Sequence, residues 1–182
     1  DEKGYTFVHP FDDEDVIAGQ GTIGMEILND LENVDAIIVP IGGGGLISGI
    51  AYAIKKLKPS CKVYGVQAAG APSMFNSKQN HRLETLSGVS TFADGIAVKK
   101  PGENTFALCQ KYVDEIVTVT DDEISAAILA LMEKHKLVTE GAGAVAVAMA
   151  PRIIAIEGVR TPFIAKERPM SAASTIRVVT TA

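Results

Sequence analysis

This sequence of 182 residues lacks tryptophan, and aromatic residues make up only 5% of it. It contains two cysteines, Cys61 and Cys109, which are too few for a disulfide scaffold and are not spaced like metal ligands. No run of lysine or arginine is longer than a pair, and the net charge is -5. Such a chain offers no basic surface to a nucleic-acid backbone or an anionic membrane. We therefore expect neither partner, and the cysteine content favours a reducing compartment, the cytoplasm.

Long apolar runs are also missing, because none approaches the ~18 residues that a membrane span requires. The first residues, 1–3, do not resemble a signal peptide, and the absence of an initial methionine indicates a start inside a longer protein. The apolar residues make up 47% of the chain and are mostly aliphatic. Such residues are typical of parallel sheets covered by helices. We expect an α/β fold in three layers, with helices on both faces of a parallel sheet.

Apolar periodicity predicts strands alternating with helices over most of the chain. Gly21 and Gly24 lie within an expected helix and indicate that another backbone, expected to be the sheet, packs closely against it. Thr120 and Glu123 fit a capping box. The expected strands are 5–8, 36–41, 63–67, 116–119 and 152–156, and the expected helices are 16–28, 46–57, 101–112, 121–136 and a fully buried 141–150 that ends at Pro151.

Four consecutive glycines, Gly42 to Gly45, follow the expected strand at 36–41 and precede a helix. Glycine lets several backbone N–H groups turn toward one point, and a helix N-terminus adds about half a positive charge. A phosphate group is therefore the expected ligand. A tight strand-to-helix turn would also use glycine, but four in a row cost more backbone entropy than a turn requires.

Two common phosphate-binding motifs do not fit this loop. The dinucleotide fingerprint G-x-G-x-x-G fails in every frame that starts within the glycine run. The neutral Gln67 ends the next strand, where that fold has a carboxylate. The loop of nucleotide hydrolases fails as well, because Ile50 and Ala51 stand where it requires lysine and serine or threonine. These exclusions leave a small phosphorylated cofactor held mainly by backbone groups.

Four motifs occur in order along the chain: GQGTIG at 19–24, PIGGGGLISG at 40–49, ADGIAV at 93–98 and TEGAGA at 139–144. Together they closely resemble the catalytic domain of threonine/serine dehydratases (threonine ammonia-lyases), which are fold-type II pyridoxal-phosphate enzymes. The resemblance covers about residues 5–150. It implies the C-terminal part of a domain with the fold of the tryptophan synthase β subunit. The implied reaction is deamination of L-threonine to 2-oxobutanoate and ammonia, or of L-serine to pyruvate.

The resemblance also implies roles for individual residues. Gly95 corresponds to the backbone segment beside the cofactor ring, and Glu140 to a carboxylate near cofactor and substrate. An acid that stabilises a helix N-terminus explains Glu140 equally well. Gln67 stands where metal-binding members have a glutamate, and we expect no metal there, since an uncharged amide is a weak ligand for a hard divalent cation. The cup for the phosphate of pyridoxal 5'-phosphate corresponds to Gly42, Gly43, Gly44, Gly45 and the amide of Leu46.

The resemblance places the lysine that forms the Schiff base upstream, in a Ser-x-Lys-x-Arg-Gly context that does not occur in this chain. Lys99 and Lys100 lie nearest to a cofactor motif but precede a Pro-Gly turn, so we interpret them as surface charges. We therefore assign no catalytic residue and expect the isolated chain to be inactive. Residues 1–150 are expected to form the partial catalytic domain, and the tail at 151–182 departs from the family and stays unassigned.

Alternative interpretations stay open. The chain could be a non-catalytic module that binds pyridoxal phosphate or another phosphate ligand, or part of another fold-type II enzyme such as serine racemase. Family members act in threonine catabolism or isoleucine biosynthesis and are usually dimers or tetramers, so the resemblance implies a homo-oligomer with a small amino acid as substrate. The histidines His9, His81 and His135 have no nucleophile or metal ligand near them in sequence, and we expect them to be structural or exposed.

Overall fold

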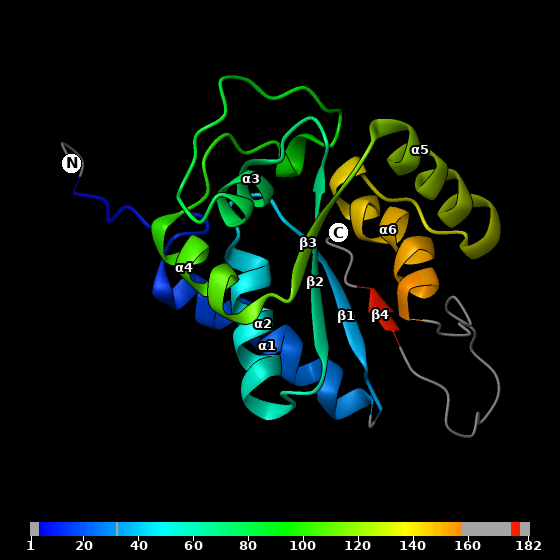
Figure 1. Cartoon of the computed structure of the whole chain (residues 1–182), viewed down its shortest axis with the longest axis horizontal. Helices are drawn as coiled ribbons and strands as arrows, with labels where there is room; N and C mark the ends of the chain where they lie inside the picture. Colours follow the sequence, from blue (N-terminus) through cyan, green and yellow to red (C-terminus); the bar gives the residue numbers. More distant parts are fainter. Residues whose placement is uncertain (1–3, 32, 158–175, 179–182) are drawn as a thin grey trace.

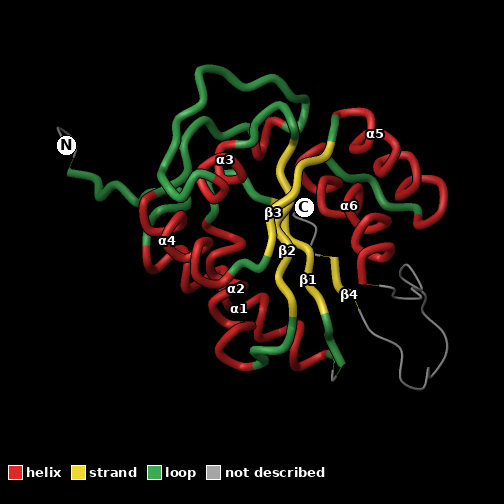
Figure 2. Tube along the Cα trace, in the orientation of Figure 1, coloured by secondary structure: helices red, strands yellow, loops and turns green. Residues whose placement is uncertain are grey.

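The computed structural model describes residues 4–31, 33–157 and 176–178. Its four-stranded sheet has the order β3-β2-β1-β4, and each pair of neighbouring strands is parallel (Figure 1, Figure 2). Helices cover both faces of the sheet, which confirms the expected three-layer α/β fold. The elements are α1 (Glu14–Asp30), β1 (Ala36–Pro40), α2 (Gly45–Leu57), β2 (Lys62–Ala68), α3 (Ser73–Gln79), η1 (Asp94–Ile96), α4 (Glu103–Tyr112), β3 (Glu115–Val119), α5 (Asp121–Ala130), η2 (Leu131–His135), α6 (Gly141–Glu157) and β4 (Ile176–Val178).

Two apolar clusters fill the space between the sheet and its helices. Along β1, Ile37 and Val39 belong to the cluster under α2, whereas Ile38 belongs to the cluster under α5 and α6. This alternation follows from the two-residue period of a strand. All of β1 is buried, as is β2 after its first residue. The continuous apolar runs of these strands therefore reflect cover on both faces.

Helices α1 and α2 cross at glycines. A Cβ atom at Gly49 would lie 2.6 Å from the backbone N of Gly21, and one at Gly24 would lie 3.2 Å from the carbonyl O of Ile50. The glycines of α1 do permit a close backbone approach, but the partner is α2 and not the sheet. This contact packs α2 against α1. Because α2 begins in the glycine run, the contact also holds that run in place.

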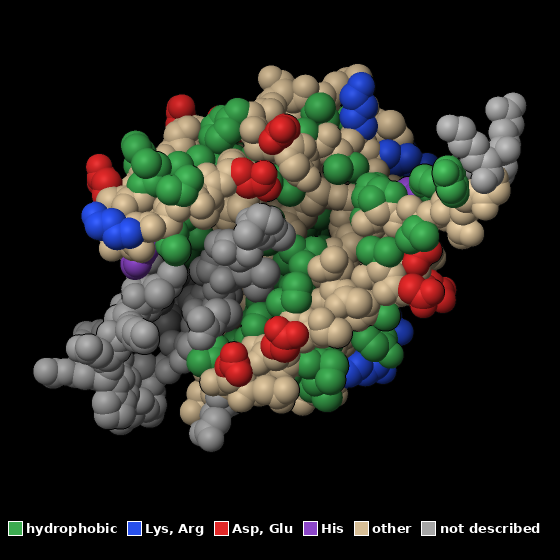
Figure 3. Space-filling model, turned by 180° about the vertical axis from the view of Figure 1, so that it is seen from behind, with side chains coloured by type: hydrophobic (Ala, Val, Ile, Leu, Met, Phe, Trp, Pro, Cys, Tyr) green, Lys and Arg blue, Asp and Glu red, His purple; other side chains and the backbone are tan. Residues whose placement is uncertain are grey.

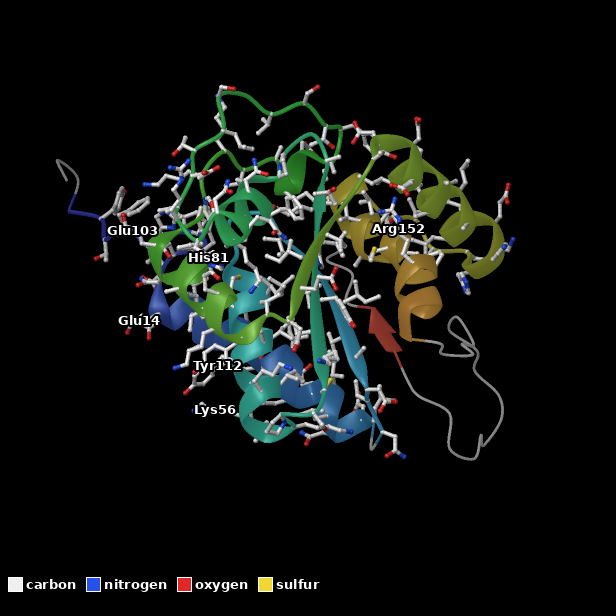
Figure 4. All side chains as sticks on the ribbon, viewed as in Figure 1. Glu14, Lys56, His81, Glu103, Tyr112 and Arg152 are labelled. Carbon is white, nitrogen blue, oxygen red and sulfur yellow. The ribbon has the colours of Figure 1, made fainter. Side chains whose placement is uncertain are left out.

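Neither of the strands expected at 5–8 and 152–156 forms. Residues 5–8 form no strand, and Tyr5 and Phe7 are 76% and 74% exposed. Pro151 does not end α6, which continues through it to Glu157, so that 152–156 are helical. A short apolar run fits either a strand or a buried helix, and its surroundings decide between them. Here Arg152 forms an ion pair with Glu123 of α5 and donates to the carbonyl O of Thr118, at 3.1 Å, which anchors the turn after the proline (Figure 4).

The strand β4 was not predicted. It comes from the tail and pairs with β1, with Ala36 opposite Ile176 and Ile38 opposite Val178. On the face opposite to Figure 1, acidic and basic side chains are interspersed with apolar ones (Figure 3). Among the helices that the structure describes, none has the length and apolar character needed to cross a bilayer.

Candidate functional site

A pocket of about 370 Å³ opens beside the glycine run, where the carboxyl end of β1 passes into α2. Every site residue predicted from the sequence lines this pocket, although these residues come from distant parts of the chain. They are Gly42, Gly43, Gly44, Gly45, Leu46, Gly95 and Glu140. The structure thus brings them together, while their role in binding a cofactor stays a prediction.

The start of α2 presents backbone N–H groups to this pocket. Its N-cap residue, Gly44, has a φ of 101°, a left-handed conformation that favours glycine. Asp13 caps α1 and Thr120 caps α5, whereas no side chain among the described residues caps α2 and its first turn has no acid. The first N–H groups of a helix need acceptors, and the helix dipole favours a negative charge there. An anion is therefore the ligand that suits this end of the pocket.

An aromatic ring covers the loop from the side of the N-terminal segment. A Cβ atom at Gly43 would collide with the ring of Phe11, and one at Gly45 would lie 3.0 Å from the backbone of Phe11. The turn that carries this ring is shaped by His9, whose Nδ1 accepts the backbone N–H of Asp12 at 2.9 Å. His9 is therefore structural, as expected. No periodicity or motif in the sequence marked Phe11 as a pocket residue.

A carboxylate lies at another wall of the pocket. A Cβ atom at Gly95 would lie 3.3 Å from Oε1 of Glu140, so the two residues are in contact. Glu140 also precedes α6, and its carbonyl O accepts the N–H of Ala144 at 3.2 Å. Both interpretations of Glu140, a pocket carboxylate and an acid at a helix N-terminus, therefore fit the structure. The four sequence motifs also contain further lining residues that we did not single out, namely Pro40, Ile96, Val98 and Ala142.

Gln67 has a structural role within the core. It is fully buried, its Nε2 donates to the carbonyl O of Ile41 at 3.3 Å, and its Oε1 accepts the N–H of Phe75 at 2.8 Å. The amide thereby joins the end of β1 to α3. Within the described ranges, no group of histidine, cysteine, aspartate or glutamate is arranged to hold a metal ion. The expectation of no metal stays a prediction.

The lysines and the remaining histidines lie away from the pocket wall. Lys99 and Lys100 are exposed, and the described residues that line the pocket include no lysine. His81 is exposed in a turn, and His135 is partly buried at the end of η2. The pocket as described therefore supplies binding groups rather than a nucleophile.

A larger groove of about 810 Å³ lies between α1, α2 and α4. Most of its lining residues are apolar or are glycine. Few polar side chains, such as those of Glu14, Lys56 and Asn104, are present to orient a ligand. Specific sites need convergent polar groups in addition to an apolar surface. The smaller pocket has these at the helix N-terminus and at Glu140, so we take it as the candidate site.

The model of the family described as pyridoxal-phosphate dependent enzyme matches residues 1–161. The chain belongs to this family. It is 52% identical over 164 residues to L-threonine ammonia-lyase of Thermotoga maritima, covering 90% of this chain and 41% of that protein. The structure matches the processed form of threonine deaminase isoform 2 from Solanum lycopersicum, with a TM-score of 0.87, 38% identity and coverage of 98% of this chain and 46% of that one.

Maize serine racemase is also similar, with a TM-score of 0.80, 36% identity and coverage of 82% of this chain and 46% of that one. The chain thus spans less than half the length of these relatives. The resemblance inferred from the four motifs is confirmed, and the family depends on pyridoxal phosphate.

The pocket fits this cofactor of the family. Pyridoxal phosphate carries a phosphate at one end and a flat ring with polar substituents at the other. The uncapped start of α2 suits the phosphate. Gly95 contributes only backbone atoms to the wall, against which a flat ring can lie, and the carboxylate of Glu140 beside it can accept a hydrogen bond.

Proposed function

We propose that this chain is the phosphate-holding part of a threonine ammonia-lyase. The whole protein then converts L-threonine to 2-oxobutanoate and ammonia, and L-serine to pyruvate as a second reaction. The observation that carries the proposal is the pocket in which the glycine run, Gly95 and Glu140 lie together. The 52% identity to an L-threonine ammonia-lyase supports the choice of reaction.

Each part of the pocket has its own task in this proposal. Bound pyridoxal phosphate supplies an electron sink for the substrate amino acid. The N–H groups of Gly42 to Leu46 and the α2 dipole hold the phosphate. Gly95 leaves room for the ring, Glu140 orients a hydrogen-bond donor of the cofactor or the substrate, and Phe11 keeps water away from the loop.

The remaining expectations are part of the same proposal. The cofactor-binding lysine lies outside this chain, which contains no Ser-x-Lys-x-Arg-Gly context. Residues 1–150 form the catalytic portion, and 151–182 keep no assigned role. The whole protein is a cytoplasmic dimer or tetramer that acts in threonine catabolism or isoleucine biosynthesis.

Serine racemase activity is a second candidate, favoured by the structural match to the maize enzyme. The test supplies the purified whole protein with L-threonine or L-serine, and measures 2-oxo acid by chromatography and D-serine on a chiral column. We expect 2-oxobutanoate from L-threonine with a higher kcat/KM than for pyruvate from L-serine. D-serine formation without 2-oxo acid would select the racemase instead.

The isolated chain provides the comparison. Residues 1–182 alone, with pyridoxal phosphate added, should release no 2-oxo acid above the rate in buffer, because the covalent anchor is absent. Robust turnover by this chain would contradict that expectation. A whole protein that binds the cofactor without any turnover would favour the non-catalytic module.

A further inference from the structure

A threonine behind the pocket holds the glycine run in place. Thr105, in the first turn of α4, is fully buried, and its Oγ1 donates a hydrogen bond to the carbonyl O of Gly43 at 2.7 Å. The backbone N–H of Gly102 donates to the same oxygen at 3.4 Å. A Cβ atom at Gly44 would lie only 2.8 Å from the Cβ of Thr105. Thr105 therefore contacts both glycines at the centre of the loop.

This hydrogen bond fixes the direction of one peptide group. In a trans peptide the C=O and the following N–H point to opposite sides. Because the carbonyl of Gly43 points to α4, the N–H of Gly44 points away from α4. The described residues that line the pocket include Gly44 but none from α4, so this N–H is directed to the side on which a ligand binds.

The peptide needs such a restraint because glycine flanks it on both sides. Glycine populates positive and negative φ about equally, so the Gly43–Gly44 peptide has little intrinsic preference for one orientation. A flipped peptide would present a carbonyl oxygen to the pocket and would repel a phosphate. The hydroxyl of Thr105 opposes the flip, since a flip would break its hydrogen bond.

The first turn of α4 is itself anchored. Its N-cap residue, Gly102, has no side chain, and Asp12 takes over the capping from the segment before α1. Oδ2 of Asp12 accepts the N–H of Glu103 at 2.9 Å, and Oδ1 accepts the N–H of Thr105 at 3.1 Å. Figure 4 shows Glu103 at this end of α4. Asp12 therefore fixes the first turn of α4, and with it the position from which the Thr105 hydroxyl reaches the loop.

We propose that Thr105 is a positioning residue for the phosphate: its hydroxyl holds the Gly43–Gly44 peptide so that the N–H of Gly44 binds the ligand. The inference rests on the proposed function, because it requires a phosphate at this loop. Since the N–H that the hydroxyl orients binds the phosphate and not the ring, loss of the hydroxyl weakens the binding of phosphorylated ligands alone.

The test compares two ligands and a pair of variants. Pyridoxine 5'-phosphate and pyridoxine differ by the phosphate and lack the aldehyde that reacts with lysines, and their affinities are measured by calorimetry on the cofactor-free whole protein. Thr105→Val removes the hydroxyl at nearly constant shape. It should weaken the binding of pyridoxine 5'-phosphate about tenfold, or about 1.4 kcal/mol, and leave the affinity for pyridoxine unchanged. Thr105→Ser keeps the hydroxyl and should restore binding. Ile54→Val, buried in the last turns of α2, controls for a general loss of stability and should change neither affinity.

The outcomes separate this inference from the proposed function. If the unaltered protein binds pyridoxine 5'-phosphate no better than pyridoxine, the phosphate site and the proposed function fail. If it prefers the phosphorylated ligand and Thr105→Val keeps that preference, the role of Thr105 is refuted. Isotope-labelled glycine in the unaltered protein gives a readout without any variant, because the amide proton of Gly44 should move downfield on adding pyridoxine 5'-phosphate. A Gly44 signal that stays in place while the other loop glycines shift overturns the inference.

Discussion

Gly49→Ala is expected to destabilise the protein although alanine is the better helix former. A Cβ atom at this position would overlap the carbonyl O of Ile17 and lie 2.6 Å from the backbone N of Gly21. Both are backbone atoms of α1, which cannot rotate away as a side chain can. Overpacking of this kind costs about 1–3 kcal/mol, and the helix propensity of alanine returns about 1 kcal/mol. Because the overlapping atoms belong to the backbone, we take the upper part of that range, about 2–3 kcal/mol, which leaves a net loss of about 1–2 kcal/mol.

Gly19→Ala is the matched control within α1. A Cβ atom at Gly19 meets no atom within 4 Å, so only the propensity gain of about 0.5–1 kcal/mol remains. The two substitutions should therefore shift stability in opposite directions. For a chain of this length 1 kcal/mol moves Tm by about 2–4 °C, which thermal unfolding followed by circular dichroism resolves. Urea unfolding with an unchanged m-value would show that only stability has changed.

A Gly49→Ala protein as stable as Gly19→Ala would refute the close crossing of α1 and α2. The crossing also matters for the pocket, because α2 begins in the glycine run. Gly49→Ala should therefore weaken binding of pyridoxine 5'-phosphate, whereas Gly19→Ala should leave it unchanged.

Three further substitutions or treatments test the pocket, the thiols and the α5 cap. Gly43→Ala places a methyl group against the aromatic ring over the loop and should weaken the binding of pyridoxine 5'-phosphate about tenfold in calorimetry. Gly88→Ala is the control: its methyl group meets no atom within 4 Å, and it should leave the affinity unchanged. Burial raises the pKa of Cys61 to about 11 and that of Cys109 to about 12. Neither thiol should therefore react with Ellman's reagent at neutral pH until denaturant is added. Fast labelling of the folded protein would contradict this. A hydrogen bond from the backbone N–H of the α5 cap residue lowers the pKa of Glu123 below its usual 4.5, so its stabilisation is present above that pH and is lost as the pH falls through the lowered value. Urea-unfolding free energies of Glu123→Gln and the unaltered protein should therefore converge in acid, and a constant difference would argue against the cap.

Local patterns predicted those features whose partners lie close in sequence. The capping box is an example: Oγ1 of Thr120 accepts the N–H of Glu123 at 3.3 Å, and Glu123 accepts the N–H of Thr120 at 2.8 Å. The expected strands at 5–8 and 152–156 failed because a short apolar run adopts the conformation that its neighbours in space allow. The helix α6 continues through Pro151, where contacts of Arg152 with α5 and β3 hold the next turn.

The order of the amino acids is enough to predict that backbone groups form the proposed phosphate site, because four successive glycines have no side chains to offer. It also carries the family resemblance through four separate motifs. What surrounds the loop depends on the folded chain, because Phe11 and Thr105 reach it from distant segments, and Thr105 is 62 residues from Gly43. No periodic pattern of apolar residues in the sequence marks such residues as neighbours of the loop. They meet the loop only because the parallel sheet and the capping of α4 by Asp12 bring these segments to one place.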